Sequence, residues 1–112
     1  RIVRDGQGEL LGIVEERDAT PEQRAIKEIN PGFFVFDREL REFVNELGND
    51  NAQGEYYLTD LPAVYLRNGR RVGTVRGGDE TGLLVGVNDR SQLARAEALL
   101  RARTRRRWLA EG

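Results

Sequence analysis

Residues 49–69 read NDNAQGEYYLTDLPAVYLRNG, and the second half of this stretch has the pattern of a helix. Its larger apolar side chains fall at helical spacing, namely Tyr57, Leu61, Val64 and Tyr65. Pro62 belongs near the first turn of a helix, because its nitrogen carries no hydrogen to donate. We therefore predict a helix that starts around Thr59 or Asp60, with one of them as N-cap, and ends at Asn68-Gly69.

The first half of the stretch is more polar than a simple connection requires. Gly54 is explained as a turn residue, and the N-cap explains one residue more. Four side chains are left without a structural role: Asn51, Gln53, Glu55 and Tyr56. The stretch caps a helix, lines a ligand pocket, or does both, and capping explains only half of it.

On the N-terminal side, two β-rich runs flank a turn signal. RIV (1–3) and ELLGIVEE (9–16) are separated by DGQG (5–8), which predicts a hairpin or two successive strands. Further along, Thr20, Pro21 and Gln23 have the spacing of a capping box with proline at the first helical position, which predicts a short helical turn.

Two further apolar segments precede residue 49. FFVF (33–36) follows Pro31-Gly32 and is predicted to be a buried strand. RELREFVNELG (38–48) is predicted to be a helix with Asp37 as N-cap and Gly48 as C-cap, because Leu40, Phe43, Val44 and Leu47 recur at three- and four-residue spacing.

Beyond residue 69 the sequence predicts two short strands and a long helix. RRVGTVRG (70–77) alternates like an edge strand, GGDETG (77–82) is a loop, and LLVGV (83–87) is a second apolar run. A helix over about 89–109 is expected, capped by Asp89 or Ser91. Its buried stripe would comprise Leu93, Ala96, Leu100 and Trp108.

Together these segments predict an α/β fold. Five short strands and three helices are compatible with a three-layer arrangement. A sheet of that size would leave exposed edges on a chain of 112 residues, and a segment N-terminal to this one is the obvious candidate to cover them.

Composition excludes several kinds of chemistry. The chain has no Cys and no His, which excludes disulfides, thiolate or imidazole metal sites, and imidazole-dependent catalytic triads. A bound metal would need oxygen ligands, which favours a hard ion such as Mg²⁺. The longest apolar run is too short for a membrane span, and the N-terminus lacks the apolar region of a signal peptide. The chain has no Met and begins with Arg1, so we expect a processed product or an excised piece.

Charge is balanced overall but uneven along the chain. The net charge is −1, while RARTRRRW (101–108) is strongly basic. Such a run with Trp108 is compatible with nucleic-acid binding. A solvated helix face is the simpler interpretation, since the net charge is slightly acidic, and we expect no nucleic-acid partner and no membrane partner.

Three places carry side chains suited to a site. Glu15 ends a predicted strand, where ligands of α/β folds commonly bind, although a surface carboxylate would look the same. Asn30 precedes Pro31 and offers an amide that suits a sugar hydroxyl or acetamido group, or simply a turn. Asn88 and Asp89 stand where an apolar run meets the long helix, so one of them caps it and the other is available for a metal-bound phosphate.

Four segments in this order carry a family resemblance: GIVEERDATPEQRAIKEIN, INPGFFVFD, NDNAQGEYYLTD and GVNDRSQLARAE. They resemble the uridyltransferase domain of the bacterial bifunctional N-acetylglucosamine-1-phosphate uridyltransferase/glucosamine-1-phosphate acetyltransferases. The resemblance extends over the whole chain but covers only the second, sugar-binding half of that domain. It implies part of a Rossmann-like nucleotidyltransferase fold, a mixed sheet with flanking helices, in which residues 1–112 lack the N-terminal nucleotide-binding half.

The resemblance also implies an activity. The family makes UDP-N-acetylglucosamine and pyrophosphate from UTP and N-acetylglucosamine 1-phosphate with Mg²⁺, in the synthesis of peptidoglycan and lipopolysaccharide precursors. By the same resemblance, we expect a cytoplasmic, homotrimeric full-length protein. On matching motif positions, Glu15 and Asn30 hold the sugar side of the product, Asn88 binds Mg²⁺, and Glu55 and Tyr57 form walls of the sugar pocket.

The chain departs from the family pattern at several points. Pro31 stands where the family usually has Thr, which removes a backbone donor beside Asn30. The glycine-rich nucleotide loop, the aspartate that shares Mg²⁺ with Asn88, and the acetyltransferase β-helix lie outside these residues. We therefore expect the isolated chain to be inactive. Three alternatives stay open: a non-enzymatic sugar-nucleotide-binding module, another sugar-1-phosphate nucleotidyltransferase, or an arginine-rich interaction protein.

Overall fold

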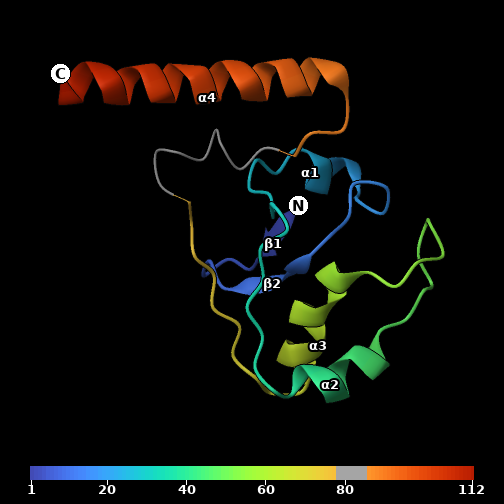
Figure 1. The fold of residues 1–112 in the computed structure, drawn as a ribbon. Helices are drawn as coiled ribbons and strands as arrows, with labels where there is room; N and C mark the ends of the chain where they lie inside the picture. Colours follow the sequence, from blue (N-terminus) through green and yellow to red (C-terminus); the bar gives the residue numbers. More distant parts are fainter. Residues whose placement is uncertain (78–85) are drawn as a thin grey trace. The chain divides into compact units, whose positions relative to one another are not determined.

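The computed structural model describes residues 1–77 and 86–112, which form two compact units, Arg1–Thr74 and Val75–Gly112. The first unit contains most of the secondary structure (Figure 1): β1 (Ile2–Arg4), β2 (Leu10–Ile13), α1 (Pro21–Arg24), α2 (Leu40–Phe43), the 3₁₀ turns η1 (Val44–Glu46) and η2 (Leu58–Asp60), and α3 (Leu61–Arg67). The second unit contains α4 (Arg90–Glu111).

The predicted hairpin forms. β1 and β2 pair antiparallel, with Ile2 opposite Ile13 and Arg4 opposite Leu10. Asp5 closes the turn, because its carboxylate accepts from the backbone N–H groups of Gln7 and Glu9, both at 2.9 Å. Gly8 adopts a φ of +88°, a left-handed conformation that glycine reaches without strain.

The predicted capping box is also confirmed. The Gln23 backbone N–H donates to the Thr20 hydroxyl at 3.3 Å, and the Thr20 N–H donates to the Gln23 side chain at 2.9 Å. Pro21 occupies the first position of α1, where no donor is needed. Local sequence chemistry therefore determines this short helix.

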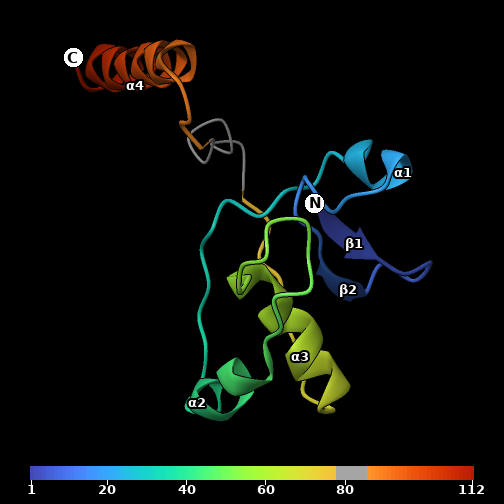
Figure 2. The same ribbon diagram turned by 90° about the vertical axis from the view of Figure 1, so that its right-hand side faces the viewer.

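The helix predicted from residues 49–69 is α3, and it provides the core. Leu61 and Val64 are 0% and 1% exposed, and Tyr57 and Tyr65 are also buried, as their spacing predicts. Views from two directions show α3 beside the hairpin on one side and near α2 on the other (Figures 1 and 2), in agreement with its contacts to β2 and α2. The N-cap is Asp60, but its side chain accepts no capping hydrogen bond, because η2 already satisfies the first turn.

The helix predicted over 38–48 is shorter than its pattern indicates. α2 covers one turn and continues as η1, and Leu47 is then extended. Gly48 is therefore not a left-handed C-cap, and that prediction is wrong. The N-cap is Glu39, so the prediction of Asp37 as N-cap is also wrong. Asp37 lies two residues earlier, where its carboxylate accepts from the Glu39 N–H at 3.0 Å and from the Tyr65 hydroxyl at 3.0 Å. Phe43 packs edge-on against Tyr65, with ring centroids 4.6 Å apart.

The buried strand predicted at 33–36 is wrong. The segment is extended but has no strand partner among the described residues, and a β-strand needs a neighbour to hydrogen-bond. Its side chains alternate: Phe34 and Phe36 are stacked 5.5 Å apart, and Phe36 packs against the core cluster, while Phe33 and Val35 are 77% and 100% exposed.

The edge strand predicted at 70–77 is wrong for the same reason. Val72 packs against the core cluster, but Val75 is exposed and no ladder forms. The second run, LLVGV, lies largely outside the described residues, as does most of the 77–82 loop. Within the described residues, the chain is therefore a small mixed α/β structure with one two-stranded antiparallel sheet, instead of the predicted five strands.

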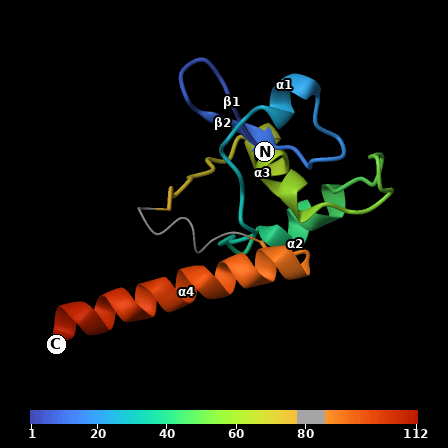
Figure 3. The same cartoon turned by 90° about the horizontal axis from the view of Figure 1, so that it is seen from above.

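The long C-terminal helix forms as α4, an unbroken helix of 22 residues (Figure 3). Asp89 is its N-cap, as predicted, and accepts from the Gln92 N–H at 2.8 Å. The predicted buried stripe is wrong, because no residue of α4 is buried, and Leu93, Leu100 and Trp108 are more than half exposed. Within residues 1–77 and 86–112, no helix has the length and apolar character needed to cross a membrane.

A two-pronged ion pair connects distant parts of the first unit. Arg4 of β1 donates from Nε and Nη2 to the two carboxylate oxygens of Glu28, at 2.9 and 2.6 Å. The same guanidinium donates to the Gly8 carbonyl at 3.0 Å and to the Thr74 hydroxyl at 3.2 Å. Hydrogen bonding to Glu28 raises the pKa of Arg4, so the pair stays charged. One side chain thus joins the hairpin, its turn, the segment after α1 and the end of the unit.

This network predicts a difference between two Arg→Lys changes. Arg4→Lys should lower the urea midpoint of the chain clearly, because an ammonium group cannot reproduce the planar, two-pronged geometry. Arg70→Lys is the matched control, since Arg70 makes a single 2.6 Å contact with Glu39 and is 52% exposed. Equal midpoints for the two variants would contradict the assigned role of Arg4.

Candidate functional site

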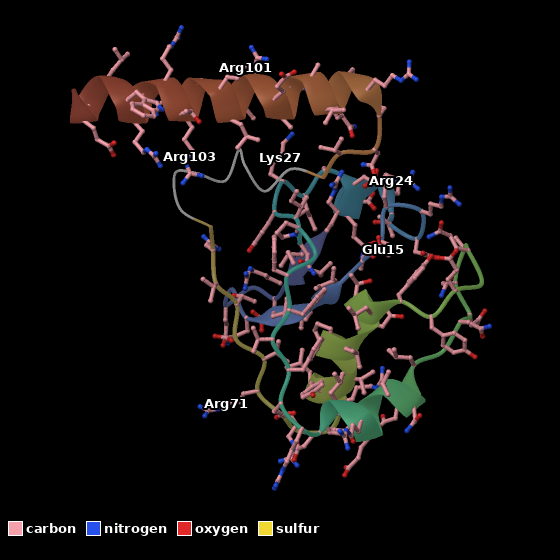
Figure 4. All side chains as sticks on the ribbon, viewed as in Figure 1. Glu15, Arg24, Lys27, Arg71, Arg101 and Arg103 are labelled. Atoms are coloured by element: carbon pink, nitrogen blue, oxygen red, sulfur yellow. The ribbon has the colours of Figure 1, made fainter. Side chains whose placement is uncertain are left out.

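The described first unit contains an open, solvent-facing cavity of about 200 Å³ where the chain leaves β2. Figure 4 labels Glu15 at this point, near the start of α3. The cavity joins two sequence segments, the end of the hairpin and the stretch that leads into α3. It is lined by Ile13, Val14, Glu15, Asp18, Asp50, Asn51, Tyr57 and Asp60.

Glu15 reaches the cavity because it lies just beyond the end of β2. Its carboxylate Oε1 accepts a hydrogen bond of 2.7 Å from the hydroxyl of Thr59, which lies in η2. Both side chains are half-buried. The partner of Glu15 is 44 residues away in the sequence, so the pattern of residues did not indicate it.

The polar stretch before α3 forms a self-bonded loop. Asn51 Oδ1 accepts from the N–H groups of Gln53 and Glu55, at 3.1 and 3.2 Å, and its Nδ2 donates to the Glu55 carbonyl. Gln53 Nε2 donates to the Tyr57 hydroxyl at 2.9 Å. The view that Asn51 and Gln53 lack a structural role is therefore wrong. Tyr56 is 69% exposed.

Asp18 fixes this loop to the hairpin side of the cavity. The Ala52 N–H donates to Asp18 Oδ1 at 2.7 Å, across 34 residues. Asp18 itself follows a turn in which its own N–H donates to the Glu15 carbonyl at 3.2 Å. The sequence analysis did not single out Asp18, because nothing local marks it as a loop anchor.

Carboxylates give the cavity a negative electrostatic character. Partial burial raises the pKa of Asp60 above the ordinary value of 3.8, and the charges of Asp18 and Glu15 raise it further, while Arg67 opposes them. Burial also raises the pKa of the Tyr57 hydroxyl, with Asp18 adding to the shift and the Gln53 donor reducing it. Tyr57 is therefore a neutral hydroxyl at physiological pH.

Of the four predicted site residues in the first unit, the structure brings two together. Glu15 and Tyr57 line the cavity, whereas Asn30 and Glu55 do not. Asn30 Oδ1 accepts from the Gly32 N–H at 2.8 Å, which is the turn role considered from the sequence. Asn88 belongs to the second unit, next to the Asp89 cap, and its backbone N–H donates to Gln92 Oε1 at 2.6 Å. The roles in binding that the sequence predicts for Asn30, Glu55 and Asn88 stay predictions.

The oxygen atoms of the described residues show whether this chain could bind a metal ion by itself. No cluster of three or more Asp or Glu side chains with metal-binding geometry occurs within the described ranges. The Asp89 carboxylate is engaged by the Ser91 hydroxyl at 2.7 Å and the Gln92 N–H. Mg²⁺ usually takes one or two carboxylates plus substrate phosphates and waters. Asn88 therefore fits as one contributing oxygen and not as a complete site.

The basic helix α4 is partly neutralised within itself. It contains seven arginines and two glutamates, and Arg101 donates twice to Glu97, at 3.0 and 2.7 Å. Arg107 lies 3.7 Å from Glu111. These i,i+4 pairs are typical of a solvated helix face. The expectation of no nucleic-acid partner stays a prediction.

Comparison with known proteins finds relatives that match the whole chain. No family model matches the chain. The bifunctional protein GlmU of Thermus thermophilus is 51% identical over 112 residues, and that of Acetivibrio thermocellus is 46% identical over 113. The bifunctional protein GlmU of Lactobacillus gasseri is 45% identical over 113 residues. Each match covers 100% of this chain and 24% of the relative, so the chain spans about a quarter of the length of these curated relatives.

The Asp18 contact predicts a local change in dynamics. Asp18→Ala should speed amide hydrogen exchange at Ala52 by about two- to tenfold, the effect of losing one hydrogen bond. Asp50→Ala is the matched control, because this carboxylate lines the same cavity and accepts no hydrogen bond from a described residue. Exchange measured by NMR that is the same in Asp18→Ala and the parent would disprove the anchoring role.

The raised pKa of Asp60 predicts the direction of a pH effect. A carboxyl whose pKa is higher in the folded chain than in the unfolded chain destabilises the fold as the pH rises through the folded value. Asp60→Asn should therefore have a higher urea midpoint than the parent at about pH 7. The difference should shrink as the pH is lowered and Asp60 takes up its proton, because its pKa is raised above the ordinary value. A difference that grows on acidification would contradict this assignment.

Proposed function

The chain belongs to the GlmU family over its whole length, and from this premise we propose that it forms the sugar-binding part of a uridyltransferase. The proposed reaction joins UTP and N-acetylglucosamine 1-phosphate to give UDP-N-acetylglucosamine and pyrophosphate, a step in the synthesis of cell-envelope precursors. The observation that carries the proposal is 51% identity to a GlmU protein across all 112 residues. The cavity beside Glu15 supports it independently.

The cavity suits the uncharged part of such a substrate. Carboxylate and amide oxygens accept hydrogen bonds from sugar hydroxyls, and a neutral tyrosine hydroxyl can donate or accept. Glu15 and Tyr57 present such groups on the lining. We assign Glu15 to a sugar hydroxyl and Tyr57 to the pocket wall. Asn30 and Glu55 are proposed to contact the same sugar, although they lie outside this lining in the free chain.

The proposed chemistry needs no His or Cys. An oxygen of the sugar phosphate attacks the α-phosphorus of UTP, and pyrophosphate leaves with the electrons of the broken P–O bond. No covalent enzyme intermediate forms, so catalysis consists of positioning and charge neutralisation. A chain without imidazole or thiol groups is suited to such a reaction.

Mg²⁺ is the cofactor that the proposal requires. When bound, it would neutralise charge on the phosphate oxygens. Asn88 would supply one oxygen ligand at the start of α4, and other ligands would come from the substrate and from residues outside this chain. A Rossmann-like domain around residues 1–112, a cytoplasmic location and a homotrimer are further parts of the proposal that follow from the family alone.

A segment exchange tests the proposal. Residues 1–112 would replace the corresponding segment of the Thermus thermophilus GlmU protein, and release of pyrophosphate from UTP and N-acetylglucosamine 1-phosphate would be measured. We expect Mg²⁺-dependent turnover. Glu15→Ala should raise the KM for the sugar phosphate about tenfold, the effect of losing one hydrogen bond to a charged group. Glu16→Ala is the matched control, because Glu16 is exposed and pairs with Arg1 at 2.9 Å.

The outcomes separate the alternatives. A folded chimera without turnover, beside an active parent enzyme, would overturn the proposed function. Turnover with a different sugar 1-phosphate only would replace it by another nucleotidyltransferase. The unattached 112-residue chain is expected to show no turnover, because the nucleotide-binding groups lie outside it.

A further inference from the structure

The hydroxyl of Thr59 has one assigned partner, and that partner is Glu15. Its Oγ1 lies 2.7 Å from Glu15 Oε1, within hydrogen-bond distance. The sequence suggests a different use, as an N-cap of α3. The structure excludes that use, since the cap of α3 is Asp60 and that of η2 is Tyr57.

The bond determines how Glu15 faces the cavity. A glutamate that follows a strand has three rotatable bonds and would otherwise sample several rotamers. Thr59 is β-branched, which restricts its χ1, and in the observed rotamer its hydroxyl donates to Glu15. It lies in η2, which contacts β2 and leads directly into the buried turn at Leu61. Glu15 Oε1 is thereby held, and Oε2 accepts no hydrogen bond from a described residue.

We propose that Thr59 is a positioning residue, which holds the Glu15 carboxylate with one oxygen occupied and the other available to a sugar hydroxyl. This inference rests on the proposed function and adds a specificity element to the same site. The proposed role of Thr59 connects the polar stretch before α3 with the start of the helix, because both contribute residues to the same site. Asn51 of the loop and Glu15 both line the cavity, and Thr59, the residue before the Asp60 cap, donates to Glu15.

The test uses the Thermus thermophilus chimera with Thr59→Val, which keeps the shape of the side chain and removes the hydroxyl. We expect the KM for N-acetylglucosamine 1-phosphate to rise about three- to tenfold, as for the loss of one hydrogen bond. The KM for UTP should stay unchanged. Thr59→Ser, which keeps the hydroxyl, should restore the parent KM for the sugar phosphate.

A matched control and a double variant separate positioning from general damage. Thr104→Val makes the same chemical change on α4, where the hydroxyl is exposed and has no hydrogen-bond partner among the described residues. It should change neither KM. In a Glu15→Ala background, Thr59→Val should have no further effect on the KM for the sugar phosphate, because no carboxylate is left to orient.

Several results would overturn the inference. They are an unchanged KM in Thr59→Val, an equal rise in the KM values of both substrates, and an undiminished effect of Thr59→Val in the Glu15→Ala background. If Thr59→Val does not fold, Thr59→Ala removes the hydroxyl without adding an apolar methyl group and is judged by the same criteria. Absence of turnover in the unmodified chimera is a different failure, because it rejects the proposed function itself.

Discussion

Burial of one face of α3 is the constraint on which the first unit depends. Leu61 and Val64 are the most completely buried side chains of the described residues, and they lie on a helix of seven residues that contacts both β2 and α2. A helix this short is not stable alone, so its stability comes from tertiary packing. Gly12 of β2 faces Ala63 of α3, and a Cβ added at Gly12 would make an ordinary van der Waals contact with the Ala63 Cβ at 3.8 Å. The hairpin and α2 thus both pack on the same short helix.

The candidate site is a consequence of the same packing. Once α3 is docked on β2, η2 lies at the end of the strand and brings Thr59 to Glu15. The loop before η2 follows, and Asp18 ties it to the hairpin side through Ala52. Asp60 is then partly buried near Glu15 and Asp18, and its pKa is raised first by burial and further by these two negative charges. Such a raised pKa in a cavity is typical of functional sites, because a fold seldom keeps like charges together for stability.

Sequence reasoning succeeds here where the determinants are local and fails where they are distant. The capping box of Thr20 and Gln23, the Asp89 cap and the face of α3 depend on residues three or four positions apart. The segment FFVF has strand-forming residues, but strand formation also needs a partner that its own sequence cannot specify. The contacts of Arg4 with Glu28, Asp18 with Ala52 and Thr59 with Glu15 span 24, 34 and 44 residues. Glu15 and Tyr57 were found through resemblance to a family, whereas Asp18 and the true partner of Thr59 required coordinates.

The charge of the cavity restricts which end of a sugar phosphate it can receive. Its lining carries four carboxylates, Glu15, Asp18, Asp50 and Asp60, and no lysine or arginine. A phosphate placed there would meet like charges at short range, which is strongly unfavourable in a partly desolvated site. Sugar hydroxyls, in contrast, are donors that match carboxylate oxygens. In the proposed function the phosphates would therefore be bound elsewhere, by Mg²⁺ and basic groups. The charge of this lining supports the proposed division of the substrate, in which these residues carry the sugar side.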